Sequence, residues 1–443
     1  MGHTETVVPG SASDAVAGAV DEGELRREMR SWLEENWDPE AGLMEWRNRL
    51  AESGWGCPSW PRQWCGRSLP AAAAEVAKDE LARVGAVGLP EGVGMHLAAP
   101  TILEHGSERL KADFIRRTVT GEVSWCQLFS EPGSGSDLAG LTTQAERDGD
   151  EWVVNGQKVW NTSAGHADFG LLLARTDWDA PKHRGITYFA IPMHQTGIEV
   201  RPLRQMNDHA SFNEVFLTDA RVPAANVIGD IGQGWTVALT TLAHERRLAI
   251  GAGAVPRGVS GRAWEEAAAE RALVFGPYTW YPQRAGRVDL VIDRARAAGR
   301  NTEPVVRQEI ARLLSLAWSA KWTAQRAAVA RAQGRAPGPE GSLGKLSSSN
   351  IARSAARVHS LIAGASGMLV GTDAPLDGTI SEILLSVPAV SIAGGTDEIQ
   401  RNILGERILG LPKEPDPARL MPFRQIPHNA TRRLGGLRHE PGL

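Results

Sequence analysis

The sequence places a carboxylate where it could take a proton in apolar surroundings. Glu245 falls on one face of an expected helix together with apolar residues. These are Trp235, Ala238, Leu242 and Ala249. A carboxylate on an apolar face is costly unless it is used or paired. Glu245 is therefore either a general base in a dry pocket or the ion-pair partner of a nearby arginine, such as Arg246.

Two further features could each bind a ligand: a turn of small residues, and an indole with a hydroxyl two positions later. Residues 133–136 read Gly-Ser-Gly-Ser, and Trp160 and Thr162 follow in a β-prone segment. Glycines let backbone N–H groups approach an anionic or carbonyl-rich ligand, and the hydroxyls are short donors. An indole can cover a planar ring system. The residues alone also allow an ordinary turn between strands and a buried strand tryptophan.

Other chemical motifs do not occur in the sequence. The turn at 133–136 is not a full GxGxxG, and there is no P-loop, GxSxG elbow or HExxH. The 11 histidines lack paired spacing, so we expect no metal site. The cysteines form no CxxC or metal-ligand pattern, which favours a reducing compartment without a disulfide framework. They are Cys57, Cys65 and Cys126.

Composition narrows the class of protein further. The 443 residues suggest two or three domains, and 42% hydrophobic with 23% charged residues is typical of folded, soluble proteins. With 48 basic and 52 acidic residues the net charge is −4, so we expect neither nucleic acid nor a membrane surface as the main partner. Without a signal-like N-terminus or a long apolar run, the expected location is cytoplasmic.

The hydrophobic period divides the chain into four parts. We expect a helical domain at 22–123, a middle β-domain at 124–230, a helical domain at 231–413 and a Pro- and Arg-rich tail at 414–443. Asp148-Gly149 is a turn signal, and Asn155-Gly156 between β-prone residues predicts a hairpin. Residues 255–290 look irregular.

Four longer stretches together resemble the acyl-CoA dehydrogenase family of flavoproteins. They are WCQLFSEPGSGSD at 125–137, WVVNGQKVWNT at 152–162, RVP at 221–223 with GQGW at 232–235 and Glu245-Arg246, and GGTDEIQR at 394–401. The resemblance covers about residues 25–413. It implies an α+β fold with an N-terminal helical domain, a middle β-domain and a C-terminal helical bundle, and FAD between the last two.

The resemblance also assigns residues to the ligands. It places the indole of Trp160 over the isoalloxazine and the hydroxyl of Thr162 on its reactive nitrogen. Ser136 and Arg246 are expected near the acyl-CoA. The full set expected at FAD is Gln127, Leu128, Ser130, Gly135, Ser136, Trp160, Thr162, Thr396 and Glu398.

The position of the catalytic base follows from a departure from the family pattern. In many members a glutamate directly precedes the Gly-Thr of the last stretch, but here that residue is Gly394. A subset, including isovaleryl- and long-chain-type enzymes, carries the base at the helix position of Glu245, so the resemblance assigns Glu245 as base. The family's Arg-x-x-Phe-Gly stretch is replaced by residues 299–308 and its Gln-containing Gly-Gly loop by residues 361–367. These replacements resemble actinobacterial members, some of which work as unlike-subunit pairs.

The expected activity is FAD-dependent α,β-dehydrogenation of an acyl-CoA, or of a carrier-protein thioester, to the 2-enoyl product. Electrons would pass to an electron-transferring flavoprotein, and the assembly would be a homotetramer or homodimer, or else a heteromer. Two alternatives stay open. One is a non-catalytic or half-site subunit of a heteromeric acyl-CoA dehydrogenase. The other is a flavin oxidase or monooxygenase on the same fold. The acyl chain is not predicted.

Overall fold

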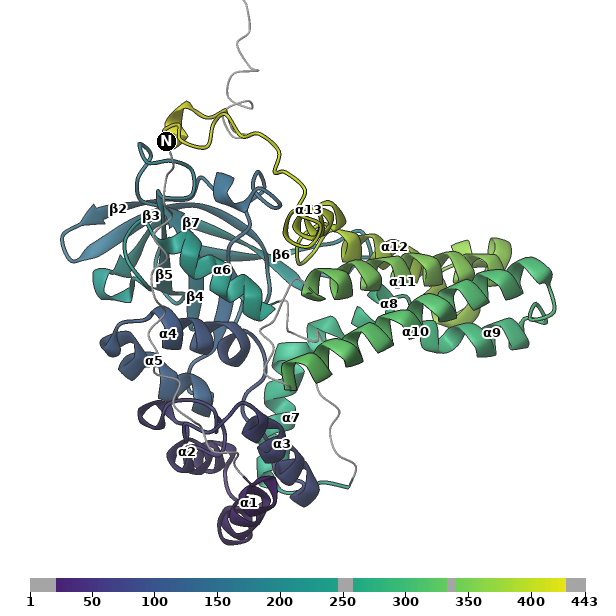
Figure 1. Ribbon diagram of the computed structural model, residues 1–443, viewed down its shortest axis with the longest axis horizontal. Helices are drawn as coiled ribbons and strands as arrows, with labels where there is room; N and C mark the ends of the chain where they lie inside the picture. Colours follow the sequence, from purple (N-terminus) through teal and green to yellow (C-terminus); the bar gives the residue numbers. More distant parts are fainter. Residues whose placement is uncertain (1–20, 246–257, 333–339, 428–443) are drawn as a thin grey trace, which may run out of the picture. The chain divides into compact units, whose positions relative to one another are not determined.

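The computed structural model describes residues 21–245, 258–332 and 340–427 (Figure 1). The chain divides into two compact units. Within the described residues, the first comprises 21–89 with 258–267, and the second comprises 90–245 with the remainder from 268.

The first unit is built on α1 (Glu22–Asn36), α2 (Leu43–Ser53) and α3 (Ala72–Val84). Helix α1 starts where the sequence predicts, because the Asp21 carboxylate caps it by accepting from Gly23 N at 2.8 Å. It buries Leu25, Met29 and Leu33. Glu80 of α3 is buried but paired with arginines, and the hydrogen bonds from Arg30 lower its pKa to about 2 against the effect of burial.

The second unit begins with two helices, α4 (Ala99–His105) and α5 (Glu108–Thr120), followed by a seven-stranded sheet. The strands are β1 (Trp125–Leu128), β2 (Gln144–Asp148), β3 (Glu151–Asn161), β4 (Phe169–Arg175), β5 (Ile186–Pro192), β6 (Ile198–Leu203) and β7 (Phe212–Pro223). Their order is β1-β4-β2-β3-β7-β6, and β5 pairs with β4. Strand β4 is parallel to β1 and β2, and the other pairings are antiparallel. Aliphatic and aromatic side chains of these strands form one core.

The hairpin predicted at Asn155-Gly156 is wrong. Strand β3 runs through both residues, and its pairing with β7 shifts register there, so the pair forms a bulge. Glycine is needed because a Cβ at Gly156 would lie 2.4 Å from Thr143 Oγ1. The turn between β2 and β3 occurs instead at Gly149, whose φ of 58° is left-handed.

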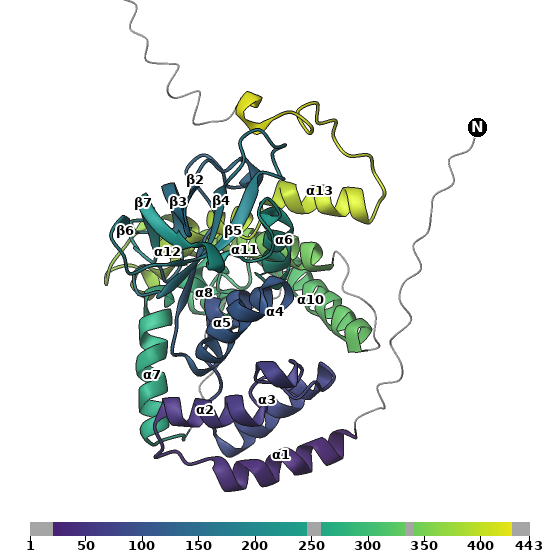
Figure 2. The same cartoon turned by 90° about the vertical axis from the view of Figure 1, so that its left-hand side faces the viewer.

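Eight further helices follow β7 among the described residues. They are α6 (Gly234–Glu245), α7 (Arg262–Phe275), α8 (Tyr281–Arg284), α9 (Val291–Ala297), α10 (Pro304–Ala332), α11 (Glu340–Ala363), α12 (Thr379–Ser386) and α13 (Asp397–Arg407). Helix α6 packs against β5 (Figure 2), and α11 packs against α10, α12 and α13. The predicted fold class, helical then β then helical, is confirmed. The prediction that residues 255–290 are irregular is wrong at α7 and α8.

Part of the predicted tail returns to the sheet. Phe423 is fully buried, its N–H donates to Ala180 O at 3.0 Å, and the Arg175 guanidinium lies 3.4 Å from its ring centroid. Arg424 pairs with Asp179 at 2.6 Å. A buried aromatic ring under a guanidinium is a specific anchor, because it combines apolar burial with a cation–π contact. Among the described helices, none has the length and apolar character needed to cross a membrane.

Candidate active site

Two predicted site residues from distant parts of the chain meet. Gln127 of β1 donates a hydrogen bond from Nε2 to Glu245 Oε2 of α6 at 3.2 Å, and both side chains are half-buried. The Gln127 carbonyl accepts from Asn161 Nδ2 at 2.7 Å. Because Asn161 follows Trp160, β1 joins the carboxylate to the strand that carries the indole.

Helix α6 is fixed closely to β5 at its first residue. A Cβ at Gly234 would lie 2.6 Å from the carbonyl carbon of Thr187, so only glycine allows this approach. The Gly232 N–H donates to Thr187 Oγ1 at 2.9 Å just before the helix. This attachment sets the direction in which α6 leads to Glu245.

The buried face of α6 differs from the predicted one. It comprises Gly234, Val237, Ala238 and Thr241. Trp235 and Leu242, which we predicted on the apolar face, are half-buried. The face is rotated because the tight contact of Gly234 with β5 sets which side of the helix meets the sheet. The predicted residues Ala249 and Arg246 lie outside the described part of the chain.

The turn of small residues is held by a buried ion pair. Glu131 accepts from Lys158 Nζ at 2.9 Å and from the N–H groups of Thr142 and Thr143 at 2.7 and 2.8 Å. Burial by itself raises the pKa of Glu131, but the Lys158 charge and these hydrogen bonds outweigh it and lower the pKa to about 2. The loop that follows is thereby anchored at its base, and Gly135 and Ser136 are exposed at its tip.

Trp160 presents an aromatic surface to solvent. Its side chain is 56% exposed although its neighbours Val159 and Asn161 are buried, and its φ of 64° is left-handed. A bulky residue in that conformation is strained, which is a pattern found at functional sites. The indole and Phe212 make an edge-to-face contact, with 5.9 Å between ring centroids. The rest of the indole is open to a planar ligand.

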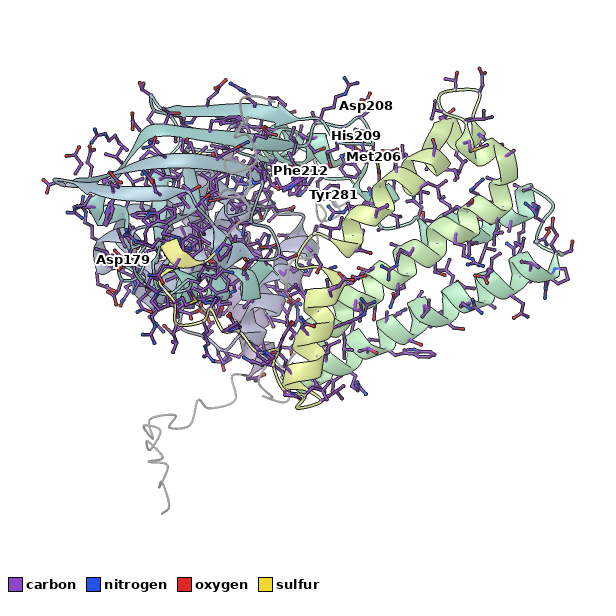
Figure 3. All side chains as sticks on the ribbon, turned by 90° about the horizontal axis from the view of Figure 1, so that it is seen from above. Asp179, Met206, Asp208, His209, Phe212 and Tyr281 are labelled. Atoms are coloured by element: carbon purple, nitrogen blue, oxygen red, sulfur yellow. The ribbon has the colours of Figure 1, made fainter. Side chains whose placement is uncertain are left out.

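An aromatic group that the sequence analysis missed lies beside the indole. Phe212 contacts Tyr278 and Tyr281, at centroid distances of 5.9 and 6.5 Å (Figure 3 labels Phe212 and Tyr281). Tyr278 donates to Ser211 O at 2.6 Å and is also hydrogen-bonded to the Thr162 side chain. A signal was present in the sequence, because two of only 3 tyrosines in the chain fall at 278 and 281.

These groups fit the flavin that the sequence predicts. An exposed indole provides a face for a planar ring. At Gly135 an added Cβ would meet no atom within 4 Å, and Ser136 next to it is exposed, so the loop tip has room for a ligand with backbone and hydroxyl donors. The Thr162 hydroxyl already has one partner in Tyr278, so a ligand there would share it.

Three other predicted cofactor residues have different surroundings. The side chain of Leu128 is fully buried in the β-domain core, so only its backbone could meet a ligand. Thr396 caps α13 by accepting from Ile399 N at 3.2 Å. Glu398 is an exposed residue that pairs with Arg401 at 3.3 Å. Their contact with a cofactor stays a prediction.

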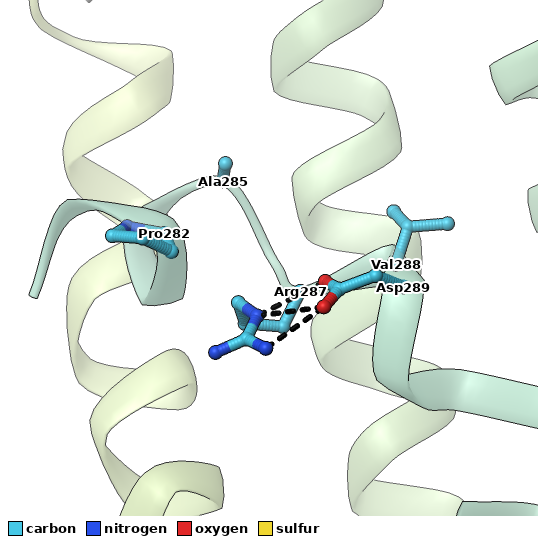
Figure 4. A pocket seen from close by; sticks show the side chains of 5 residues that line it. All are labelled: Pro282, Ala285, Arg287, Val288 and Asp289. Carbon is cyan, nitrogen blue, oxygen red and sulfur yellow. Dashed lines mark hydrogen bonds and ion pairs between the residues drawn. The ribbon is translucent and has the colours of Figure 1, made fainter. Parts of the chain in front are cut away.

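A hollow of about 510 Å³ lies in another part of the second unit (Figure 4). It is lined by Pro282, Ala285, Arg287, Val288 and Asp289. Its two charged side chains, Arg287 and Asp289, pair with each other at 2.8 Å. Because these charges neutralise each other and none of the predicted site residues lines it, we assign no chemistry to this hollow.

Known proteins resemble the chain over nearly its whole length. Three domain families match it: acyl-CoA dehydrogenase N-terminal domain at 17–122, middle domain at 126–220 and C-terminal domain at 262–409. The acyl-CoA dehydrogenase IpdE1 of Mycobacterium tuberculosis (strain ATCC 25618 / H37Rv) is 33% identical over 89% of this chain and 99% of its own.

Solved structures agree with these matches. The ChsE4–ChsE5 complex from Mycobacterium tuberculosis superposes with a TM-score of 0.62 at 27% identity, over 90% of this chain and 100% of that chain. The Tcur3481–Tcur3483 steroid ACAD has a TM-score of 0.62 at 25% identity, over 89% of this chain and 98% of that chain.

Proposed function

The chain belongs to the acyl-CoA dehydrogenase family, and we propose that it uses bound FAD to dehydrogenate an acyl-CoA thioester to the 2-enoyl-CoA. One observation carries the proposal: Gln127 of β1 donates to the Glu245 carboxylate at 3.2 Å. The loop that follows β1 and the indole of Trp160 on β3 are suited to a flavin. A half-buried carboxylate oriented by a neutral amide can accept a proton.

Each residue has a proposed role. When bound, FAD would supply the oxidant for the Cα–Cβ bond. Glu245 takes the α-proton, and Gln127 orients the carboxylate that receives it. Trp160 covers the ring system, and the loop tip at Gly135 and Ser136 offers backbone and hydroxyl donors. Ser130, Thr162, Leu128, Thr396 and Glu398 complete the proposed FAD set, and Ser136 and Arg246 are the proposed contacts to the thioester.

We also propose the electron acceptor, the subunit partner and the substrate. Reducing equivalents would leave through an electron-transferring flavoprotein. A similar solved structure is described as the ChsE4–ChsE5 complex, which supports testing for an unlike subunit beside a homo-oligomer. Another is described as a steroid ACAD, so a steroid-derived acyl-CoA is our first candidate for the substrate.

An anaerobic absorbance titration tests the function. Purified protein is mixed with butyryl-CoA, isovaleryl-CoA, palmitoyl-CoA or a CoA thioester of a cholesterol side-chain acid. Bleaching of the flavin band by one of them, with formation of the enoyl product, is the expected result. Bound flavin that none of the four bleaches would contradict acyl-CoA dehydrogenation. The same titration in air detects peroxide, and a peroxide yield matching turnover would point to an oxidase.

A further inference from the structure

Three hydroxyl groups meet inside the second unit, one helical turn before Glu245. Thr241 of α6 lies 2.9 Å from Thr101 Oγ1 of α4 and 3.0 Å from the Tyr188 hydroxyl of β5. All three side chains are fully buried. The cluster therefore joins α6 to both a helix and a strand through polar groups that water does not reach.

One assignment of protons satisfies the whole cluster. The Thr241 hydroxyl donates to Val237 O at 3.3 Å, which leaves its oxygen to accept from Tyr188 and Thr101. Tyr188 and Thr101 then depend on the same acceptor. A buried donor without an acceptor costs free energy. The two side chains therefore hold α6 in one rotation about its axis and in one position along it.

Glu245 follows Thr241 by four residues, so the two share a side of the helix. Burial raises the pKa of the Tyr188 hydroxyl, and the negative charge of Glu245 adds to that effect. Nothing in the reaction proposed above uses Tyr188, Thr241 or Thr101. Because the cluster is centred on Thr241, one helical turn before Glu245, these residues could support the carboxylate.

We propose that Thr241, Tyr188 and Thr101 are positioning residues that fix the last described turn of α6 and so aim the Glu245 carboxylate at the α-carbon of the thioester. The inference rests on the proposed function, because it gives these groups a role only if Glu245 is the base. Small displacements of a catalytic group slow proton transfer without changing affinity, so the role has a kinetic signature.

Substitutions at Thr241 test this role in the full chain. Thr241→Val keeps the shape and removes the acceptor, whereas Thr241→Ser keeps the hydroxyl. The matched control is Thr240→Val. Thr240 is the adjacent residue and also bonds α4: its hydroxyl donates to Glu104 at 3.2 Å and so accepts from His105 Nε2 at 2.8 Å. It is not part of the buried cluster.

The readouts are the limiting rate of flavin bleaching, the dissociation constant of the thioester from the same titration, FAD content and melting temperature. The probe is whichever of the four thioesters bleaches the wild-type protein fastest. We expect Thr241→Val to lower the limiting rate by at least about 10-fold with the dissociation constant and FAD content within about 2-fold of wild type. Thr241→Ser should restore the rate, and Thr240→Val should leave it unchanged.

Equal limiting rates in Thr241→Val and Thr240→Val would overturn the positioning role. So would a joint loss of rate, FAD and thioester affinity in Thr241→Val that Thr241→Ser does not reverse, since that pattern is one of damaged folding. If Thr241→Val does not fold, Tyr188→Phe removes one donor and must show the same rate-specific loss. A wild-type protein that binds flavin but is bleached by none of the thioesters would refute the proposed function itself, and the positioning role with it.

Discussion

The side-chain amide of Gln127 donates to the carboxylate of Glu245 at 3.2 Å, across 118 positions of sequence. This contact orients one oxygen of the Glu245 carboxylate. Because the donor is a neutral amide, it does not compete for the proton that Glu245 is proposed to accept. It also links β1 to α6 at the point where the predicted base and the predicted flavin loop must cooperate. The first two predictions concern these two residues.

Replacing Glu245 by glutamine should abolish turnover while leaving the cofactor bound. General-base removal typically costs about 10²- to 10⁴-fold in rate, and the amide keeps the size of the side chain. Stopped-flow bleaching and FAD content measure the two effects. Glu199→Gln is the control, because that exposed glutamate belongs to a surface pair with Arg201 at 2.7 Å, outside the proposed site. Full-rate bleaching by Glu245→Gln would remove Glu245 as base.

Replacing Gln127 by leucine should slow bleaching by about 10-fold, because the carboxylate loses the donor that orients it. The backbone contact of residue 127 with Asn161 does not involve the side chain and should persist. Gln157→Leu is a matched control, since Gln157 is also half-buried and donates to a glutamate, Glu214, at 3.4 Å. Identical rates in both variants would mean that the Gln127 contact has no catalytic consequence.

Trp160→Ala should weaken FAD binding by about 10-fold or more, because stacking of an indole on a ring system is worth about 1 kcal/mol beyond the apolar area that it covers. Isothermal titration of apoprotein with FAD gives the dissociation constant. Trp322→Ala provides the comparison, as that indole is 60% exposed and lies on α10. An unchanged FAD affinity in Trp160→Ala would show that the indole does not cover the flavin.

Glu131→Gln should change how the free energy of unfolding depends on pH. The folded-state pKa of Glu131, about 2, lies below its ordinary value of 4.5, so the paired carboxylate stabilises the fold fully above pH 4.5 and this contribution is lost as pH falls through 2. The variant should lack that part of the acid dependence. It should also be about 3 to 5 kcal/mol less stable at neutral pH, because Lys158 is then buried without its counter-charge.

Urea unfolding at several pH values measures both effects of Glu131→Gln. Glu199→Gln serves as a control, since its pair with Arg201 at 2.7 Å is on the surface. A Glu131→Gln variant with the acid dependence of wild type would show that this ion pair does not stabilise the folded chain.

Phe423→Ala should lower the free energy of unfolding by about 3 to 5 kcal/mol, the usual cost of deleting a buried phenylalanine ring. Part of the loss comes from the contact with Arg175, whose guanidinium also donates to Ala139 O at 2.8 Å. Thermal unfolding measures the change. Leu420→Ala, three residues earlier and 81% exposed, should be neutral. A Phe423→Ala protein as stable as Leu420→Ala would mean that the burial of Phe423 does not stabilise the folded chain.

Sequence reasoning succeeded where a signal is local. The helical start at residue 22 and the turn at Gly149 follow from residue type and neighbours alone, and the four family stretches indicated the order of the domains. It failed at Asn155-Gly156, since the reason for glycine there is Thr143, a residue on the neighbouring segment. The rotation of the α6 face has the same origin, because contact with β5 at Gly234 decides it.

The site was predicted in part for the same reason. Motifs pointed to Gln127 and Glu245 as candidates, but the hydrogen bond between them depends on how α6 packs against the sheet. The contact between Thr162 and Tyr278 joins two segments that are far apart in the sequence, so neither segment alone predicts it. Tyr188 and Thr241 look like ordinary core positions until both hydroxyls are seen to meet in the interior.

The return of the chain at Phe423 gives the C-terminal helices a second point of attachment. They join the β-domain covalently before Gly234, and they join it again where Phe423 sits under Arg175. A segment held at both ends explores a small volume, so its effective concentration at the sheet stays high even when its other contacts break. A partner that competes for the face of β5 covered by α6 would therefore have to displace a helix that stays tethered to the sheet.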